Sequence, residues 1–239
     1  MKNILITGAN RGLGLELTRQ YLERGDTVFA AARQPDSATD LHQLQSQYAT
    51  QLHFVQLDVT DEASIEAARQ TVTGLTSQLD VLVNNAGIFP GAGPEDPAKQ
   101  HLGGLTAANA ITFLKVNAVG PLLVAQAFLE LLKAANKARI VSLSSGQGSL
   151  TWKASSEPYH YSASKAALNM YMRALAAEVG IYGVISILVD PGWVQTGMGG
   201  STAALPPAES ARGIIRLAEQ LHAEENGSFV TWQGQPVPW

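Results

Sequence analysis

The chain has 239 residues and a mass of 25.3 kDa, with 46% hydrophobic and 15% charged residues, a composition that excludes an intrinsically disordered protein. Its 20 acidic and 16 basic residues give a formal net charge of −4 with no Lys/Arg block, which argues against a nucleic acid partner. The absence of cysteine excludes disulfides, thiolate nucleophiles and cysteine-ligated metals.

Short apolar runs alternate with longer amphipathic stretches along the chain. The short runs predict strands covered on both faces, at residues 4–6, 27–31, 52–57, 79–83, 139–143, 184–189 and 228–231. The longer stretches predict helices at residues 13–24, 61–72, 105–135, 161–181 and 207–222. This alternation predicts an α/β, Rossmann-type doubly wound fold with about seven parallel strands and helices on both faces. Residues 90–104 are expected to form a surface loop, so that residues 1–239 form a single domain.

Neither a secretory signal nor a membrane helix is expected. The first apolar run, Ile4-Leu5-Ile6, is far shorter than the roughly 7–15 residues of a signal sequence, and we identify no run of the ~20 apolar residues that a membrane helix needs. We therefore expect a cytoplasmic protein with no membrane partner.

The first predicted strand runs directly into a glycine-rich turn, Thr7-Gly8-Ala9-Asn10-Arg11-Gly12-Leu13-Gly14, and then a helix. Such a turn lets the backbone approach a pyrophosphate, which the helix N-terminus attracts. The spacing is GxxxGxG, which differs from the common GxGxxG dinucleotide motif and from the phosphate loop that ends in GK[ST]. A purely structural turn is the alternative.

The second predicted strand indicates which dinucleotide the turn binds. It ends in Ala30-Ala31-Ala32-Arg33, with no carboxylate where one would bind the ribose 2′-hydroxyl of NAD. Arg11 and Arg33 favour the 2′-phosphate of NADP(H) instead, unless one or both side chains simply face water.

Two polar segments, Asp58-Val59 and Asn84-Asn85-Ala86-Gly87, follow the third and fourth predicted strands. Open α/β sheets bind ligands at this edge, where Asp58 is placed to accept a hydrogen bond from the adenine amino group. Asn/Gly segments are also common in ordinary turns.

Tyr161 and Lys165 are four residues apart on a predicted helix, so their side chains share one face. A free tyrosine has a pKa near 10, and a neighbouring ammonium lowers that value by stabilising the phenolate. A serine-rich strand end, residues 142–146, precedes this pair and offers a hydroxyl for a carbonyl oxygen. The five histidines form neither an HExxH motif nor a short metal-binding pair, so no metal is expected.

Taken in order, these motifs resemble the short-chain dehydrogenase/reductase (SDR) family. The fragments at residues 10–16 and 191–196 are most similar to its C-factor-like carbonyl reductase branch. The resemblance implies that Tyr161 is the catalytic acid/base and that Lys165 lowers its pKa and binds the nicotinamide ribose. It further implies that Ser145, rather than its neighbour Ser144, binds the substrate oxygen, and that Asn117 supports a water relay to Lys165.

The resemblance also implies a cofactor site. Its members would be Gly8, Asn10, Arg11, Gly12, Leu13, Gly14, Arg33, Asp58, Val59, Asn85, Ala86, Gly87, Tyr161, Lys165, Pro191, Gly192, Val194 and Thr196.

We therefore expect an NADPH-dependent oxidoreductase that reduces an aldehyde, ketone or quinone to an alcohol by hydride transfer. The alternatives are a non-catalytic NADP(H)-binding redox sensor, an NAD-dependent alcohol dehydrogenase, and an isomerase or epimerase on the same fold. The family places its substrate lid at about residues 195–207. Within it, residues 197–206 have Met198 and Leu205 as their only sizeable side chains, which predicts an open apolar mouth. Because the family usually pairs its long helices, a homodimer or homotetramer is expected.

Overall fold

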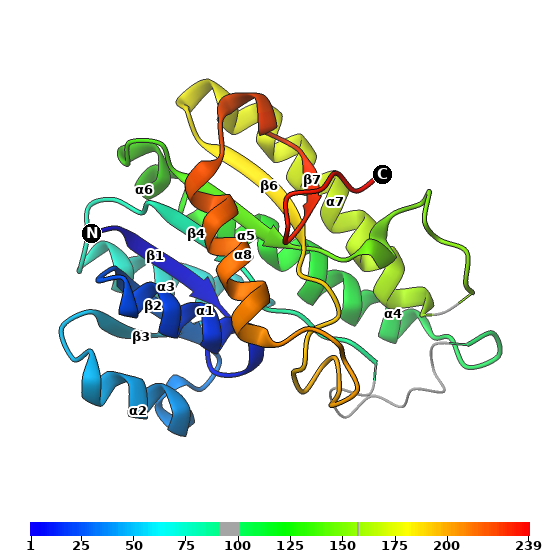
Figure 1. Cartoon of the computed structure of the whole chain (residues 1–239), viewed down its shortest axis with the longest axis horizontal. Coiled ribbons are helices and arrows are strands. Elements are labelled where there is room, and N and C mark those ends of the chain that lie inside the picture. Colours follow the sequence, from blue (N-terminus) through cyan, green and yellow to red (C-terminus); the bar gives the residue numbers. More distant parts are fainter. Residues whose placement is uncertain (91–100, 157) are drawn as a thin grey trace.

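The computed structural model describes residues 1–90, 101–156 and 158–239 and has a parallel sheet at its centre (Figure 1). The sheet contains seven strands in the order β3-β2-β1-β4-β5-β6-β7. They are β1 (Asn3–Thr7), β2 (Thr27–Ala32), β3 (Leu52–Gln56), β4 (Val81–Asn84), β5 (Arg139–Leu143), β6 (Ile185–Asp190) and β7 (Phe229–Thr231). The predicted doubly wound fold is confirmed, and every strand begins and ends within two residues of its predicted bounds. Of the predicted loop at 90–104, residues 91–100 lie outside the described part of the chain.

Helices cover both faces of the sheet (Figure 1). One face carries α1 (Gly12–Glu23), α2 (Thr39–Gln47) and α8 (Pro207–Gln220). The other carries α3 (Glu62–Thr73), α5 (Gly120–Ala127), α6 (Leu129–Ala134) and α7 (Tyr159–Val179), with α4 (Ala107–Leu114) packed on α7.

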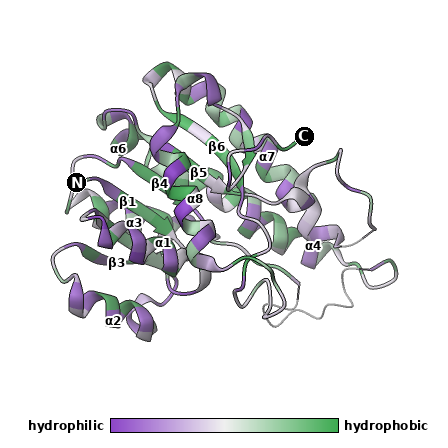
Figure 2. Ribbon diagram, in the orientation of Figure 1, coloured by the Kyte–Doolittle hydropathy of each residue, from purple (hydrophilic) through white to green (hydrophobic). Residues whose placement is uncertain are grey.

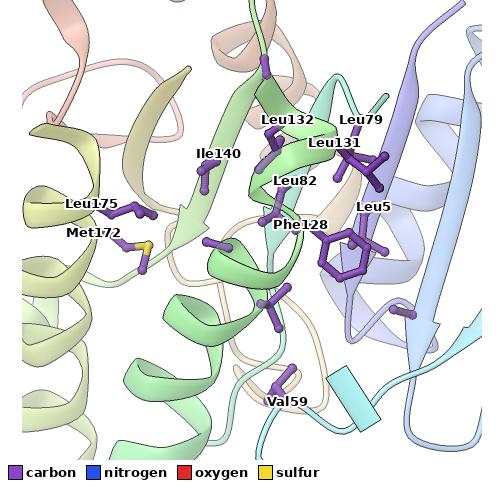
Figure 3. Packing of buried hydrophobic residues seen from close by; sticks show 14 of the residues in the cluster. Leu5, Val59, Leu79, Leu82, Phe128, Leu131, Leu132, Ile140, Met172 and Leu175 are labelled. Carbon is purple, nitrogen blue, oxygen red and sulfur yellow. The ribbon is translucent and has the colours of Figure 1, made fainter. Parts of the chain in front are cut away.

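Two hydrophobic cores follow from the two-residue period of the strands, which sends neighbouring side chains to opposite faces. Leu5 belongs to the core under α3, α5 and α7, whereas Ile4 and Ile6 belong to the core under α1 and α8. Figure 3 shows the first core, where Leu82 on a strand and Phe128 after α5 lie close together. Figure 2 shows the apolar residues of the central strands in green and many hydrophilic residues, in purple, in the helices around them.

Two helical features differ from the sequence expectations. The patterns did not locate α2, because of its nine residues only Leu41 is buried and no apolar stripe develops. The single helix predicted at 105–135 is divided into α4, a π-helical turn at Lys115–Val119, α5 and α6. Pro121 has no N–H to donate to the carbonyl of Asn117 four residues earlier, and the helix widens at this point.

One helical run, Ala107–Ala127, is long and apolar enough to cross a membrane by length and composition, contrary to the expectation that the chain has no such run. In the structure its π-helical turn buries Asn117 and Ala118, and α5 packs against α3 and α7. Core helices of soluble proteins can be as long and apolar as this run, so its length and composition are weak evidence for a membrane span.

The last residues fold back along β7. The Val237 N–H donates to the carbonyl of Phe229 at 2.9 Å, and the Thr231 N–H donates to the carbonyl of Gln235 at 2.8 Å. The backbone oxygen of Trp239 accepts hydrogen bonds from the N–H and the hydroxyl of Thr151, at 3.0 and 2.7 Å. This returning segment thus ties the edge of the sheet to the loop that follows β5.

Candidate active site

The glycine turn after β1 is held against the end of β4 by polar side chains. The Thr7 hydroxyl oxygen accepts hydrogen bonds from the N–H groups of Asn85 and Ala86, both at 3.0 Å. The Asn85 side-chain amide donates to the carbonyls of Thr7 and Gly8, at 2.7 and 3.0 Å. A Cβ at Gly14 would collide with the Gly8 carbonyl and the Asn85 amide, so glycine is required for α1 to begin this close to the turn.

Two further glycines shape the turn toward a ligand. Gly8 and Gly12 have φ angles of 66° and 55°, a left-handed conformation that glycine adopts without strain. A Cβ at Gly12 would lie 3.3 Å from Cβ of Thr196, so the turn meets the loop after β6. Helix α1 begins without a side-chain cap, which leaves its first N–H groups available to an anion.

A polar cleft of about 920 Å³ extends from the glycine turn across the ends of β2 and β3. It is lined by Asn10, Arg11, Arg33, Gln34, Ser37, Gln56, Asp58, Asp61, Ser64, Ala67 and Thr71. Arg11 and Arg33 are exposed there, and one Asp58 carboxylate oxygen accepts from the N–H and hydroxyl of Thr60. A cleft with two guanidinium groups beside an uncapped helix fits an adenosine that carries an extra phosphate.

The Tyr161–Lys165 pair lies buried in the first turns of α7. The Lys165 ammonium donates to the carbonyl of Leu143 at 2.7 Å and lies 5.8 Å from the centre of the Tyr161 ring. The side chain of Ser145, just after β5, is near enough to Tyr161 to lower the pKa of the tyrosine. The Phe89 ring packs edge-on against Tyr161, with 4.8 Å between ring centres.

Burial has the largest effect on the proton affinities of this pair. It raises the pKa of Tyr161 to about 12; the negative charge of Asp190 adds to this effect, and the side chain of Ser145 opposes it. Burial also lowers the pKa of Lys165 to about 8, against the opposite effect of Asp190. Burial of the phenol therefore has a larger effect on the Tyr161 pKa than any neighbouring charge, and the expected lowering by Lys165 stays a prediction. Tyr161 is protonated at neutral pH.

Asn117 projects from the π-helical turn into a position beside Lys165. Its amide nitrogen donates to the Ile88 carbonyl and the Ser164 hydroxyl, each at 3.0 Å, and its oxygen accepts from the Ile88 N–H at 2.8 Å. A Cβ at Gly87 would lie 3.3 Å from this oxygen and 3.9 Å from the Lys165 ammonium. Gly87 thus separates the two groups and leaves space between them.

The structure gives the two adjacent serines different surroundings. The Ser144 hydroxyl is buried and donates to the Asn169 side chain of α7 at 2.5 Å. Ser145 is half-buried, and its hydroxyl also accepts from the Gln147 N–H at 3.2 Å. Neighbouring residues in extended backbone point to opposite sides, and of these two described residues only Ser145 lowers the pKa of Tyr161.

The loop after β6 brings Pro191, Gly192, Val194 and Thr196 to the same edge of the sheet. Val194 pairs with Leu205 in an isolated parallel bridge. The two ends of the segment expected to be a substrate lid are hydrogen-bonded to each other. The Gln195 N–H donates to the Leu205 carbonyl, and the Leu205 N–H donates to the Trp193 carbonyl.

Not every predicted residue presents a side chain to the site. Leu13 and Val59 are buried in the hydrophobic cores, so only their backbone is open to a ligand. Asp190 is a further residue of the site that was not predicted from the sequence, and its carboxylate accepts hydrogen bonds from the N–H groups of Gly146 and Gly192. The available signal was its place at the end of a strand, directly before Pro191-Gly192. Ser37, which lines the cleft, was not predicted either.

Comparisons with known proteins place the chain among short-chain dehydrogenases. The family model described as short chain dehydrogenase matches residues 2–205. The C-signal protein of Myxococcus xanthus is 38% identical over 164 residues, which are 69% of this chain and 95% of that protein. Solved structures are also similar over the whole chain, two carbonyl reductases among them. The NADPH-bound carbonyl reductase from chicken fatty liver has a TM-score of 0.90 at 33% identity and is covered to 99%. The carbonyl reductase Sniffer of D. melanogaster has a TM-score of 0.92 at 31% identity and is fully covered.

Proposed function

Because the chain belongs to the short-chain dehydrogenase family, we propose that it is an NADPH-dependent reductase that converts a small aldehyde, ketone or quinone to an alcohol. The observation that carries the proposal is the buried Tyr161, close to Ser145 and one helical turn from Lys165, at the edge of the sheet that carries the cofactor cleft. The likeness to two carbonyl reductases supports the reductive direction.

Proton transfer would involve three side chains with separate roles, Ser145, Tyr161 and Lys165. When bound, the reduced nicotinamide supplies a hydride to the substrate carbon. The hydroxyls of Ser145 and Tyr161 donate hydrogen bonds to the substrate oxygen, and Tyr161 releases its proton as charge develops there. The positive charge of Lys165 stabilises the resulting phenolate. A pKa of about 12 keeps Tyr161 protonated in advance, which suits the reductive direction.

The cofactor site would consist of the glycine turn, the cleft and the loop after β6. Gly8, Gly12 and Gly14 let the backbone approach a pyrophosphate, and Arg11 with Arg33 would pair with a 2′-phosphate. The NADPH held by the chicken carbonyl reductase supports this choice. We propose that NADPH binds at least about tenfold more tightly than NADH, a difference of about 1.4 kcal/mol.

A parallel fluorescence titration with NADPH and NADH tests the cofactor assignment. Arg11→Ala and Arg33→Ala should each weaken NADPH binding while leaving NADH binding unchanged. Arg69→Ala is the matched control, since Arg69 pairs with Glu66 on α3 and does not line the cleft. Equal affinity of the native protein for both cofactors would refute the preference and leave the Tyr161 mechanism standing.

Replacement of Tyr161 by Phe tests the chemistry. It removes the hydroxyl and keeps the ring against Phe89. We expect kcat/KM for carbonyl reduction to fall by about 10²–10⁴-fold with little change in the NADPH dissociation constant. A variant that keeps more than about a tenth of the activity would exclude Tyr161 as the proton donor.

We also propose that the protein forms a homo-oligomer through α4 and α7. These helices pack together, yet Ile111 of α4 and Met170 of α7 are 53% and 68% exposed. Light scattering gives the oligomeric state. The double variant Ile111→Glu/Met170→Glu should dissociate the oligomer, whereas Ile181→Glu, at a more exposed position beyond α7, should not.

A further inference from the structure

Asp190, the last residue of β6, makes hydrogen bonds to two loops of the site at once. Its Oδ2 accepts from the Gly146 N–H at 3.1 Å, and its Oδ1 accepts from the Gly192 N–H at 3.0 Å. Gly146 directly follows Ser145, whereas Gly192 belongs to the loop after β6 that meets the glycine turn. One carboxylate thus links the segment that would bind substrate with a segment that would bind the cofactor.

The packing around Gly146 shows that this link is closely built. A Cβ at position 146 would lie 3.1 Å from Oδ2 of Asp190 and 3.2 Å from Cε3 of the Trp152 ring. Glycine therefore lets the carboxylate reach the amide, and the indole of Trp152 packs against the same position. On the other side, Ser210 of α8 donates its hydroxyl hydrogen to the Pro191 carbonyl at 2.7 Å, which fixes the second loop to the body of the protein.

The charge of Asp190 also acts on the two titratable side chains of α7 that it faces. It raises the pKa of Tyr161 and that of Lys165. Both effects favour the protonated forms, a phenol that can donate a proton and an ammonium that keeps its charge despite burial.

We propose that Asp190 is a positioning residue that couples the Ser145 loop to the Pro191-Gly192 loop, so that the substrate-binding hydroxyl and the cofactor-binding segment keep a fixed relative position. Its consequence for catalysis rests on the proposed function. An ordinary Asp-Pro-Gly turn would need only the local bond to Gly192. The second bond, to an amide 44 residues earlier in the chain, distinguishes coupling from a simple turn.

The substitution Asp190→Asn should remove one of the two hydrogen bonds and keep the other. The asparagine oxygen can keep the local bond to Gly192, while the NH₂ group faces the Gly146 amide and cannot accept from it. We expect kcat/KM for carbonyl reduction to fall by about ten- to a hundredfold, the range for loss of one hydrogen bond to a charged group. The NADPH dissociation constant should change less than about threefold. The pH above which reduction declines should move downward, because the negative charge no longer opposes ionisation of Tyr161.

The matched control is Asp80→Asn. The Asp80 carboxylate also accepts from a backbone N–H, that of Asn3 at 2.7 Å, but it lies at the opposite ends of the strands. This variant should leave both kcat/KM and the pH profile unchanged. If Asp190→Asn loses activity only in proportion to its folded fraction, with the same pH profile as the native protein, Asp190 is a structural residue and the proposal is overturned.

Amide hydrogen exchange measured by NMR provides a second readout that does not depend on turnover. In Asp190→Asn the Gly146 amide should exchange about tenfold faster or more, with little change at Gly192, because only the Gly146 bond is lost. Unchanged exchange at Gly146 would overturn the coupling. If the native protein fails to oxidise NADPH with any carbonyl compound tested, the proposed function is wrong. The exchange measurement still decides whether Asp190 links the two loops.

Discussion

Lys165→Met should make the folded protein more stable at neutral pH while removing its activity. Lys165 is 6% exposed, and its ammonium makes a hydrogen bond to the Leu143 carbonyl. Burial lowers its pKa from 10.5 to about 8. Each tenfold change in proton affinity corresponds to about 1.4 kcal/mol, so keeping this charge in the folded state costs about 3 kcal/mol at neutral pH. Methionine fills similar space without a charge and leaves the Leu143 carbonyl without that partner, at about 1 kcal/mol. The net gain is about 2 kcal/mol.

The pH dependence of this gain identifies its cause. Between pH 8 and 10.5 the unfolded chain binds more protons at this lysine than the folded chain does, so the native protein becomes more stable as the pH rises. By about pH 9.5 the penalty has fallen to about 1 kcal/mol, and the advantage of the methionine variant disappears. Urea unfolding of both proteins at pH 7 and pH 9.5 measures the difference.

The control for this experiment is Lys115→Met, at an exposed position in the π-helical turn, which should leave the pH dependence of unfolding unchanged. A stability difference between native protein and Lys165→Met that is equal at both pH values would refute the argument from charge burial. So would a methionine variant that is less stable than the native protein at pH 7. A stabilised but inactive variant would show that the site retains a charge at the expense of stability, as active sites commonly do.

Two predictions concern the glycine turn. Thr7→Val should lower the free energy of unfolding by about 2–4 kcal/mol, because the N–H groups of Asn85 and Ala86 both lose their acceptor. Thr18→Val, which breaks one hydrogen bond within α1, should cost less. Urea denaturation compares the two variants, and equal losses would contradict the reasoning. Gly14→Ala should cost about 1–3 kcal/mol and weaken NADPH binding, because the added Cβ would collide with the Gly8 carbonyl and the Asn85 side chain. Unchanged fluorescence titration and unfolding curves would show that the turn adapts.

The strands were the most predictable part of the fold. In a parallel sheet covered on both faces each strand is an uninterrupted apolar run, and β5 and β6 therefore appear in the sequence almost at their observed bounds. Helix α2 gives no such signal, because it buries one leucine and is otherwise polar. The π-helical turn adds a residue to one helical turn without changing the composition, and only Gly120-Pro121 hints at it.

The candidate site was predictable in membership more than in energetics. Residues at strand ends converge in any parallel sheet, so Asn85 and Ser145 could be placed at one edge. The bond from Gly146 to Asp190 joins two strand ends and depends on which neighbours the sheet brings together in three dimensions. The direction of the Tyr161 pKa change depends on burial, which the four-residue spacing to Lys165 does not reveal.

The fold-back of the chain along β7 bears on how copies of this protein can meet. An edge strand with free N–H and C=O groups is a template for intermolecular β-pairing. Here the Thr231 N–H and the Phe229 carbonyl are already engaged by Gln235 and Val237. Cross-strand growth from β7 would first require this short segment to detach, so the protein carries its own protection against aggregation at that edge.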